Sequence, residues 1–188
     1  MGSGIYNEFS VVEADLNHIQ YLQDNLRNTD VRECLIHGAT PFRALMVGIR
    51  EDQAETYTAL VNGKPAFMFG TVPIYEQMIA NIWMLGTYEL EKYPITFMKL
   101  SKYVIDYFQK KFYQLENVVP ADHIKTLNYL DFLGFHIIDQ PVMINGFKVL
   151  RFYRCKDNKN IVSTNEQPCY SWSPFWITRW SERRITDI

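Results

Sequence analysis

The fold of this chain is set by the stretch Ala80-Asn81-Ile82-Trp83-Met84-Leu85-Gly86-Thr87 and by the segment that follows it up to Phe135. The stretch is an apolar run of strand length that ends at a glycine, and it is too short to span a membrane. A run of this kind is typical of a strand buried on both faces. We expect it to be a central strand of a sheet.

A long amphipathic helix is predicted after this strand. Pro94 suits the first position of a helix, because its φ is fixed and its missing N–H would have no partner there. The helix is expected to run to about Phe112. Apolar residues recur along it at spacings of three and four, as a buried stripe requires. The stripe consists of Phe97, Leu100, Val104 and Phe108, widened by Ile95, Met98, Ile105 and Phe112.

A second strand and a second helix complete the segment. Leu115 to Val119 is a short β-prone run that ends at Pro120, and a helix is predicted from about Ala121 until Gly134 terminates it. The order strand, helix, strand, helix implies a parallel βαβ core.

Two helical signals stand in the first quarter of the chain. Asp15 is placed to cap a helix after a first strand at residues 9–14. Asp30 and Glu33 have the spacing of a capping box in front of Cys34-Leu35-Ile36. We therefore expect a compact helical region before the sheet continues.

The strongest local turn signal is Asn62-Gly63, which lies between two β-prone runs and predicts a two-residue hairpin turn. Residues 135–138 and 149–153 are predicted to form a closing antiparallel pair. We expect one domain over residues 1–155 and a linker and tail over residues 156–188.

Composition excludes some classes of function. The 188 residues carry a formal net charge of −2, so the chain has no general attraction for phosphate backbones, and specific nucleic-acid binding is not expected. The N-terminus lacks the apolar core of a signal peptide, which predicts synthesis in a cytoplasm. Aromatic residues make up 15% of the chain, a high share that favours contact surface beyond a monomer's core.

The last residues form an unusual aromatic segment. Trp172, Trp176 and Trp180 are four apart, so a helix would bring them to one face, with Phe175 and Arg179 close by. The segment either packs on its own domain or binds a partner, since Trp and Arg are enriched at interface hot spots. We favour a partner, and a membrane surface is a weaker third alternative.

In element order, residues 6–154 resemble the GCN5-related N-acetyltransferase (GNAT) fold, an α/β (α+β) arrangement of a mixed central sheet flanked by helices. Six segments carry a further resemblance in sequence: Asp30-Val31-Arg32-Glu33, Pro65-Ala66-Phe67-Met68-Phe69-Gly70, Ile82-Trp83-Met84-Leu85-Gly86-Thr87, 97–101, Leu115-Glu116-Asn117-Val118-Val119 and 124–135. Through these segments the chain resembles the internal virion protein A family of T7-type podophages and its acetyltransferase-like relatives.

The resemblance implies a loop that this chain lacks. Active GNAT enzymes carry a Q/R-x-x-G-x-G/A loop after the central strand, whose N–H groups hold the pyrophosphate of coenzyme A. Here the segment between Thr87 and Pro94 contains no glycine, and it places Glu89 and Glu91 where the phosphates would lie. A carboxylate beside a pyrophosphate is electrostatically unfavourable.

The resemblance also implies an Asn and, seven residues later, a proton-donating Tyr in the last helix. Counting back from Gly134, His123 and Leu130 stand at those positions. Leucine cannot transfer a proton, and Tyr129 is about 100° around the helix, so we expect it to face elsewhere.

For a general base the candidates are Tyr57, Glu76 and Glu116, with His123 as a further possibility, and the pattern singles out none of them as catalytic. If the chain is active, the residues expected to hold acetyl-CoA are Leu85, Gly86, Thr87, Ile95, Thr96 and His123.

Two functions follow from the resemblance, and a third, a catalytically dead module that binds a host protein, cannot be separated from the first of them by sequence. The favoured one is a non-catalytic virion protein that uses the fold as a scaffold and binds portal, tail or core proteins through its tail, in many copies, with no cofactor. Such a protein would pass from the host cytoplasm into the virion. The alternative is an acetyl-CoA-dependent N-acetyltransferase that acts on a protein or a small amine of the infected host.

Overall fold

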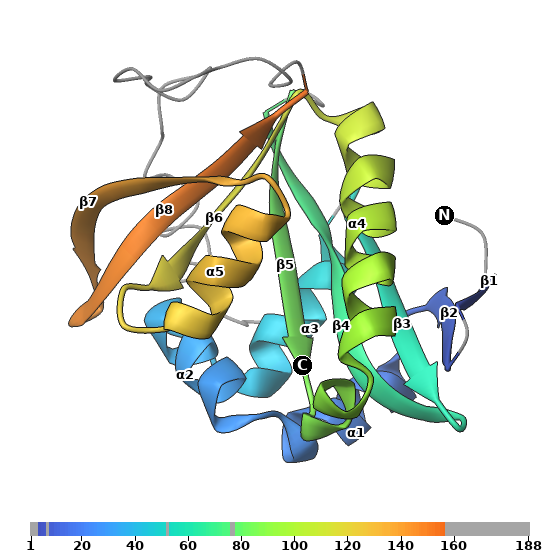
Figure 1. Ribbon diagram of the computed structural model, residues 1–188. Coiled ribbons are helices and arrows are strands. Elements are labelled where there is room, and N and C mark those ends of the chain that lie inside the picture. The colour runs from blue at the N-terminus through green and yellow to red at the C-terminus, as the bar shows by residue number, and fades with distance from the viewer. Residues whose placement is uncertain (1–3, 7, 52, 76–77, 157–188) are drawn as a thin grey trace.

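The computed structural model describes residues 4–6, 8–51, 53–75 and 78–156, which form one sheet with helices on both faces (Figure 1). The sheet has eight strands in the order β1-β2-β3-β4-β5-β6-β8-β7. Their bounds are β1 Gly4–Tyr6, β2 Phe9–Glu13, β3 Glu55–Val61, β4 Lys64–Tyr75, β5 Ile79–Gly86, β6 Gln114–Pro120, β7 His136–Ile144 and β8 Phe147–Cys155. The predicted tail residues Trp172, Phe175, Trp176, Arg179 and Trp180 lie outside the described residues.

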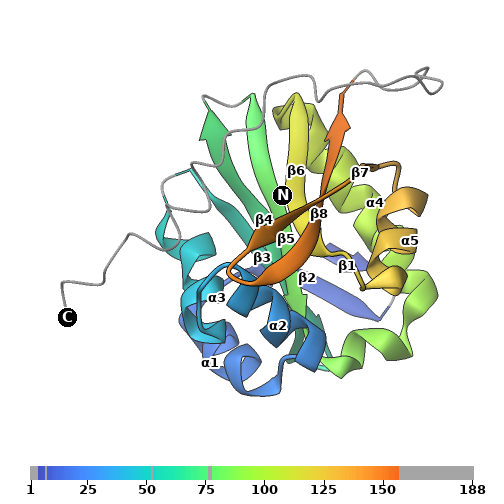
Figure 2. The ribbon, with the colours of Figure 1, turned by 90° about the vertical axis from the view of Figure 1, so that its left-hand side faces the viewer.

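The helices divide between the two faces of the sheet (Figure 2). One face is covered by α1 (Leu16–Asn25), α2 (Asn28–Ile36) and α3 (Pro41–Arg50), and the other by α4 (Pro94–Lys111) and α5 (Ile124–Phe132). A 3₁₀ helix, η1 (Tyr88–Lys92), joins β5 to α4. Each face has its own apolar core, with Met68 and Leu85 on the α1–α3 side and Phe67 and Phe69 on the α4 side. In the described part of the chain, no helix is long and apolar enough to cross a membrane.

Several local predictions are confirmed. The side chain of Asp15 accepts a hydrogen bond of 2.9 Å from the backbone N–H of His18 and so caps α1. At the β3–β4 hairpin both Asn62 and Gly63 have positive φ, at 50° and 75°, as a two-residue turn that matches the strand twist requires. The closing pair is also present, although β8 lies between β6 and β7.

The parallel pair β5 and β6 is confirmed, and it is short. The strands pair only at Ile79↔Gln114, Ala80↔Leu115 and Asn81↔Glu116, and beyond these residues they diverge (Figure 1). The remaining neighbouring pairs in the sheet are antiparallel. The divergence opens a split in the middle of the sheet, between the carboxyl ends of its two parallel strands.

Two expectations are wrong. Ile95 is not part of the buried stripe of α4, since it is 72% exposed; it lies about 200° around the helix from Phe97 and therefore on the opposite side. Asp30 and Glu33 do not form a capping box, because α2 begins earlier, at Asn28, and has no side-chain cap. Both side chains instead line a pocket.

Candidate active site

A pocket of about 750 Å³ passes through the split between β5 and β6 and is lined from both faces of the sheet. Successive side chains of a strand point to opposite faces, so β5 contributes to both sides. Ile82 and Met84 pack with the core on the α4 side, while Trp83 and Leu85 pack with the core on the α1–α3 side. We call the part of the pocket on the α4 side of the sheet the α4 lobe, and the part on the α1–α3 side the α2 lobe.

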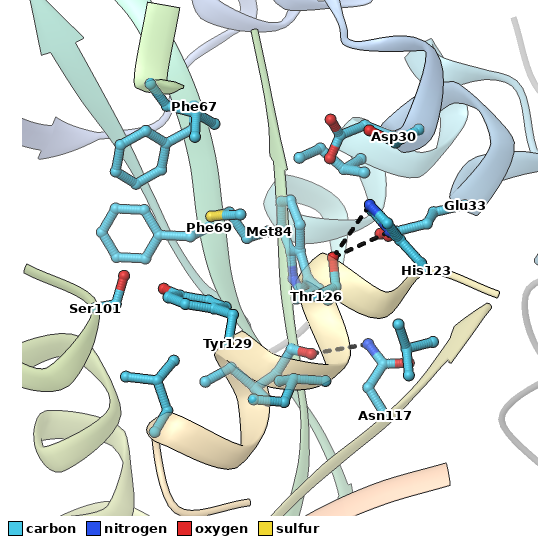
Figure 3. A pocket seen from close by; sticks show the side chains of 18 of the residues that line it. Asp30, Glu33, Phe67, Phe69, Met84, Ser101, Asn117, His123, Thr126 and Tyr129 are labelled. Carbon is cyan, nitrogen blue, oxygen red and sulfur yellow. Dashed lines mark hydrogen bonds and ion pairs between the residues drawn. The ribbon is translucent and has the colours of Figure 1, made fainter. Parts of the chain in front are cut away.

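The α4 lobe is mainly aromatic and apolar (Figure 3). Phe67 and Phe69 of β4 project into it, with ring centroids 5.6 Å apart. Phe97 of α4 stacks on Tyr129 of α5, with centroids 5.3 Å apart and an interplanar angle of 18°. The stack joins the two helices across the lobe, so the lobe is walled by rings on two sides.

Tyr129 brings a hydroxyl into this apolar lobe, beside the hydroxyl of Ser101 (Figure 3). Burial raises the pKa of the Tyr129 phenol, and interaction with Ser101 offsets part of that rise. The expectation that Tyr129 faces elsewhere is therefore wrong. Leu130 also lines the pocket, because the lobe is wide enough to take side chains from adjacent positions of α5.

The α2 lobe contains a group of charged side chains. Arg27 binds Asp30 through two hydrogen bonds, of 2.5 and 3.0 Å, and its guanidinium lies 3.5 Å from a carboxylate oxygen of Glu91 on η1. Asp30 is only 2% exposed, and burial raises its pKa while Arg27 opposes the rise. Arg27 thus ties α2 to η1 across the end of the pocket.

Glu33 and His123 form a second polar group in the pocket (Figure 3). Glu33 Oε1 lies 3.7 Å from Nδ1 of His123, which is also 3.0 Å from the Thr126 hydroxyl. Burial raises the pKa of Glu33, while its hydrogen bond with His123 lowers it. A half-buried carboxylate with a raised pKa beside an imidazole is well suited to accept a proton. The sequence showed Glu33 only as a capping residue, and it gave no signal that α2 would bring it to His123.

The six residues expected to hold acetyl-CoA are only partly brought together. Leu85 and His123 line the pocket. Gly86 is packed tightly, since a Cβ there would lie 2.6 Å from a side-chain carbon of Leu90, and the Thr87 hydroxyl donates to the carbonyl of Ala66 at 3.1 Å.

At the start of α4, the Thr96 hydroxyl donates to the carboxylate of Glu8 at 2.5 Å, and Ile95 points to solvent.

The segment η1 occupies the place of the phosphate-binding loop. It has Glu89 and Glu91 in its first turn, and Lys92 binds Glu89 at 2.7 Å rather than standing free. With Pro94 lacking an N–H at the first position of α4, the residues here do not fit a pyrophosphate. The α4 lobe, by contrast, is lined mainly by apolar and aromatic side chains.

Of the predicted general-base candidates, His123 lines the pocket, whereas Tyr57 and Glu116 do not. The Tyr57 hydroxyl donates to Glu55 at 3.1 Å on β3, and buried Glu116 accepts a hydrogen bond of 2.6 Å from Gln114. Glu76 is outside the described residues. Within the described ranges, no group of three or more His, Cys, Asp or Glu side chains is arranged to hold a metal ion.

No family model and no curated protein matches the sequence. Solved structures do match the fold.

An acetyltransferase of the GNAT family from Streptococcus pneumoniae is 15% identical, with a TM-score of 0.55, over 79% of this chain and 99% of the other. The ribosomal-protein-S5-alanine acetyltransferase of Vibrio fischeri is 12% identical, with a TM-score of 0.59, over 86% and 100%. A Bacillus subtilis acetyltransferase in complex with CoA is 16% identical, with a TM-score of 0.50, over 79% and 97%.

At these identities the likeness concerns the fold alone, and the described part of this chain has the GNAT fold.

Proposed function

We propose that this protein transfers an acyl group from a pantetheine thioester, such as acetyl-CoA, to an amine. The observation that carries the proposal is the pocket that passes through the sheet at the split between β5 and β6. Two reactants that enter from opposite faces meet in such a pocket without competing for the same space. We thus favour the N-acetyltransferase alternative over the virion scaffold.

The α4 lobe is the proposed donor site. Phe67, Phe69 and the Phe97–Tyr129 stack provide apolar walls for an acyl-pantetheine arm. A thioester supplies an activated acyl carbon and a thiolate leaving group. Tyr129 holds a proton at its phenolic oxygen inside this lobe, where a departing thiolate needs one. A phenol is already protonated at neutral pH, and burial raises the pKa of Tyr129 further.

The α2 lobe is the proposed acceptor site. An amine is a nucleophile only in its neutral form, so a group in the site has to accept a proton from the ammonium. Glu33 is that group in this proposal, and His123 orients its carboxylate and stabilises it once charged. The negative charge of Glu33 also favours a cationic substrate over a neutral or anionic one, whereas the charge of Asp30 is balanced by Arg27.

The solved structures support the proposal. Those compared above are acetyltransferases, and one of them is in complex with CoA. The acidic η1 segment argues for a donor held mainly by its pantetheine arm, with little contribution from the pyrophosphate.

The test is a calorimetric titration of the full chain with acetyl-CoA and with S-acetyl-N-acetylcysteamine, a thioester that lacks the nucleotide. We expect both to bind, with dissociation constants in the micromolar to millimolar range. A matched control is the Phe69→Trp variant, which fills the α4 lobe and should weaken both ligands alike. If neither thioester binds at millimolar concentration, the proposal is wrong.

The virion scaffold remains the second candidate, and the acidic η1 segment favours it, since that segment opposes coenzyme A binding. It predicts many copies of the chain in purified particles and contacts with portal, tail or core proteins through the tail. Replacing Trp172, Trp176 and Trp180 by Ala should then reduce incorporation into particles while leaving the domain folded. Full incorporation of this variant would contradict the tail's predicted role.

A further inference from the structure

Ser101 of α4 makes a hydrogen bond that its helix does not need. Its hydroxyl donates to the backbone carbonyl of Phe97 over 2.8 Å, and the residue is buried, with 9% of its surface exposed. In an α-helix the same carbonyl also accepts the backbone N–H of the residue four positions later, which is Ser101 itself. The carbonyl therefore keeps a partner when the hydroxyl turns away, so the hydroxyl can change its own partner at little cost.

The Ser101 hydroxyl lies beside the hydroxyl of Tyr129, and both residues line the pocket (Figure 3). Phe97 holds this pair in place, because its ring stacks on Tyr129 with centroids 5.3 Å apart while its carbonyl binds Ser101. Burial raises the pKa of the Tyr129 phenol, whereas the hydrogen bond with Ser101 and, to a smaller extent, the charge of Arg27 lower it. Ser101 thus acts on the phenol oxygen that is the proposed proton donor.

The direction of the hydrogen bond between the two hydroxyls depends on the charge of Tyr129. A serine hydroxyl has one hydrogen to donate and two lone pairs that accept. While its hydrogen is directed at Phe97, the Ser101 oxygen can only accept, so the neutral phenol donates to it. A phenolate has no hydrogen and can only accept, so the bond reverses. The reversal requires rotation of the Ser101 hydroxyl and no movement of the backbone.

We infer that Ser101 is a positioning residue for the proton donor, since it holds the Tyr129 hydroxyl in the α4 lobe and donates to the phenolate once the proton has left. The inference rests on the proposed function and adds a residue to it. The phenol hydrogen turns from Ser101 to the leaving sulfur, and the Ser101 hydrogen turns from Phe97 to the phenol oxygen.

The protons of this step balance. The O–H bond of the Tyr129 phenol breaks as the S–H bond of the thiol forms, and Ser101 keeps its own proton throughout. Solvent then reprotonates the phenolate, and Glu33 returns the proton of the amine to solvent.

A titration without any ligand tests the hydrogen bond to the phenolate. 3,5-Difluorotyrosine is incorporated at position 129 of the full chain, because its fluorine atoms make the phenol more acidic and report its ionisation by fluorine NMR. We expect Ser101→Ala to raise the pKa of this phenol by about 1–2, since a hydrogen bond to a charged acceptor is lost. An unchanged pKa overturns the inference.

Ser10→Ala is the matched control for the titration. It also removes a serine hydroxyl, but Ser10 lies on β2 and does not line the pocket. This variant should leave the pKa of the fluorinated phenol unchanged. A shift as large as that of Ser101→Ala would show that the titration does not report the Ser101 contact, and it would overturn the inference.

A double-mutant cycle tests the role in catalysis, with acetyl transfer from acetyl-CoA to 1,3-diaminopropane as the measurement. We expect Ser101→Ala to lower kcat about 10- to 100-fold and to leave both KM values within about twofold, because the bond to the phenolate forms only in the transition state. In the Tyr129→Phe background the same substitution should have no further effect. A loss of kcat that persists in that background overturns the inference, as does a wild-type kcat in Ser101→Ala alone.

A purely structural role for Ser101 predicts different results. A serine that only bonds the carbonyl four residues earlier weakens a helix slightly, and alanine is the better helix former. Ser101→Ala keeps the fold in either case, which circular dichroism verifies. The two roles are therefore separated by kcat and by the pKa of the phenol, and stability does not enter.

Failure of this inference is distinguishable from failure of the proposed function. If the chain binds acetyl-CoA and transfers the acetyl group, but kcat and the phenol do not respond to Ser101→Ala, only the inference about Ser101 is wrong. If the chain binds no thioester, the proposed function is wrong, and Ser101 has no proton donor to position.

Discussion

Asn117 of β6 donates its side-chain amide to the backbone carbonyl of Ile82 on β5 over 2.8 Å, one residue beyond the last paired position of the two strands. Its own side-chain oxygen accepts the backbone N–H of Val118 at 2.8 Å. A side chain thus takes the place of the next ladder hydrogen bond and fixes the point at which the sheet opens. The pocket depends on this point, since it passes through the opening.

Asn117→Asp should destabilise the protein by about 1–3 kcal/mol, because a carboxylate cannot donate to Ile82 and would face a carbonyl oxygen. Urea unfolding measures the change. Asn128→Asp, an exposed substitution on α5, is the matched control and should cost less than about 0.5 kcal/mol. Equal unfolding midpoints for the two variants would show that the Asn117 bridge does not stabilise the split.

Tyr129→Phe tests the proposed proton donor. We expect kcat to fall by about 10²–10⁴-fold, while the fold is kept, because the ring and its stack on Phe97 remain. The measurement is acetyl transfer to an amine at saturating acetyl-CoA, with circular dichroism to verify folding. Tyr103→Phe removes a hydroxyl from an exposed position of α4 and should leave kcat unchanged. A kcat close to the wild-type value in Tyr129→Phe would exclude the phenol as the donor.

The acidic η1 segment leads to a prediction about the donor nucleotide. Glu89→Gln and Glu91→Gln combined should tighten coenzyme A binding by about two- to tenfold at low salt, since two carboxylates no longer repel the pyrophosphate. Loss of Glu91 also releases Arg27 from one of its two carboxylate partners. Calorimetry at two salt concentrations measures the change, which should shrink as salt rises.

S-Acetyl-N-acetylcysteamine carries no phosphate, and its affinity should not respond to these substitutions. Glu13→Gln, at an exposed position of β2, is the control for a general loss of negative charge. If the short thioester gains as much affinity as coenzyme A, the effect does not come from repulsion of phosphates.

The fold could be predicted from the sequence where local chemistry determines structure. Asn62-Gly63 specifies a tight turn through positive φ, and Pro94 starts α4 because a proline ring suits the first turn of a helix and not its interior. The apolar run at β5 similarly requires a central strand. Each of these signals acts within a few residues, so no knowledge of the rest of the chain is needed.

The site could not be predicted in the same way, because its residues come from separate elements. Glu33 on α2 and His123 at the start of α5 meet only once the sheet is assembled. Asn81 lies within an apolar run, where the pattern shows a buried strand and not which side chains face a pocket. Tyr129 lines the pocket because the α4 lobe is wide, and the width of a pocket cannot be predicted from the helical periodicity of a sequence.

His37 gives a prediction about pH and stability. It lies at the end of α2 and lines the pocket, and burial lowers its pKa to about 4. In the unfolded chain its pKa is about 6.5, so folding favours the neutral imidazole. The stabilisation from this group is fully present above pH 6.5 and is lost as the pH falls from 6.5 through about 4. Over that window the free energy of unfolding should fall by about 2–4 kcal/mol because of His37 alone.

The His37→Gln variant isolates this contribution, since its side chain does not titrate. Urea unfolding at pH 7.5, 5.5 and 4 should show that the wild-type protein loses stability more steeply than the variant as the pH falls. His136→Gln removes an exposed imidazole and keeps His37, so it must retain the steep decline. If wild type and His37→Gln decline in parallel, then His37 takes up a proton in the folded protein as readily as in the unfolded chain, and the α2 lobe admits water at that position.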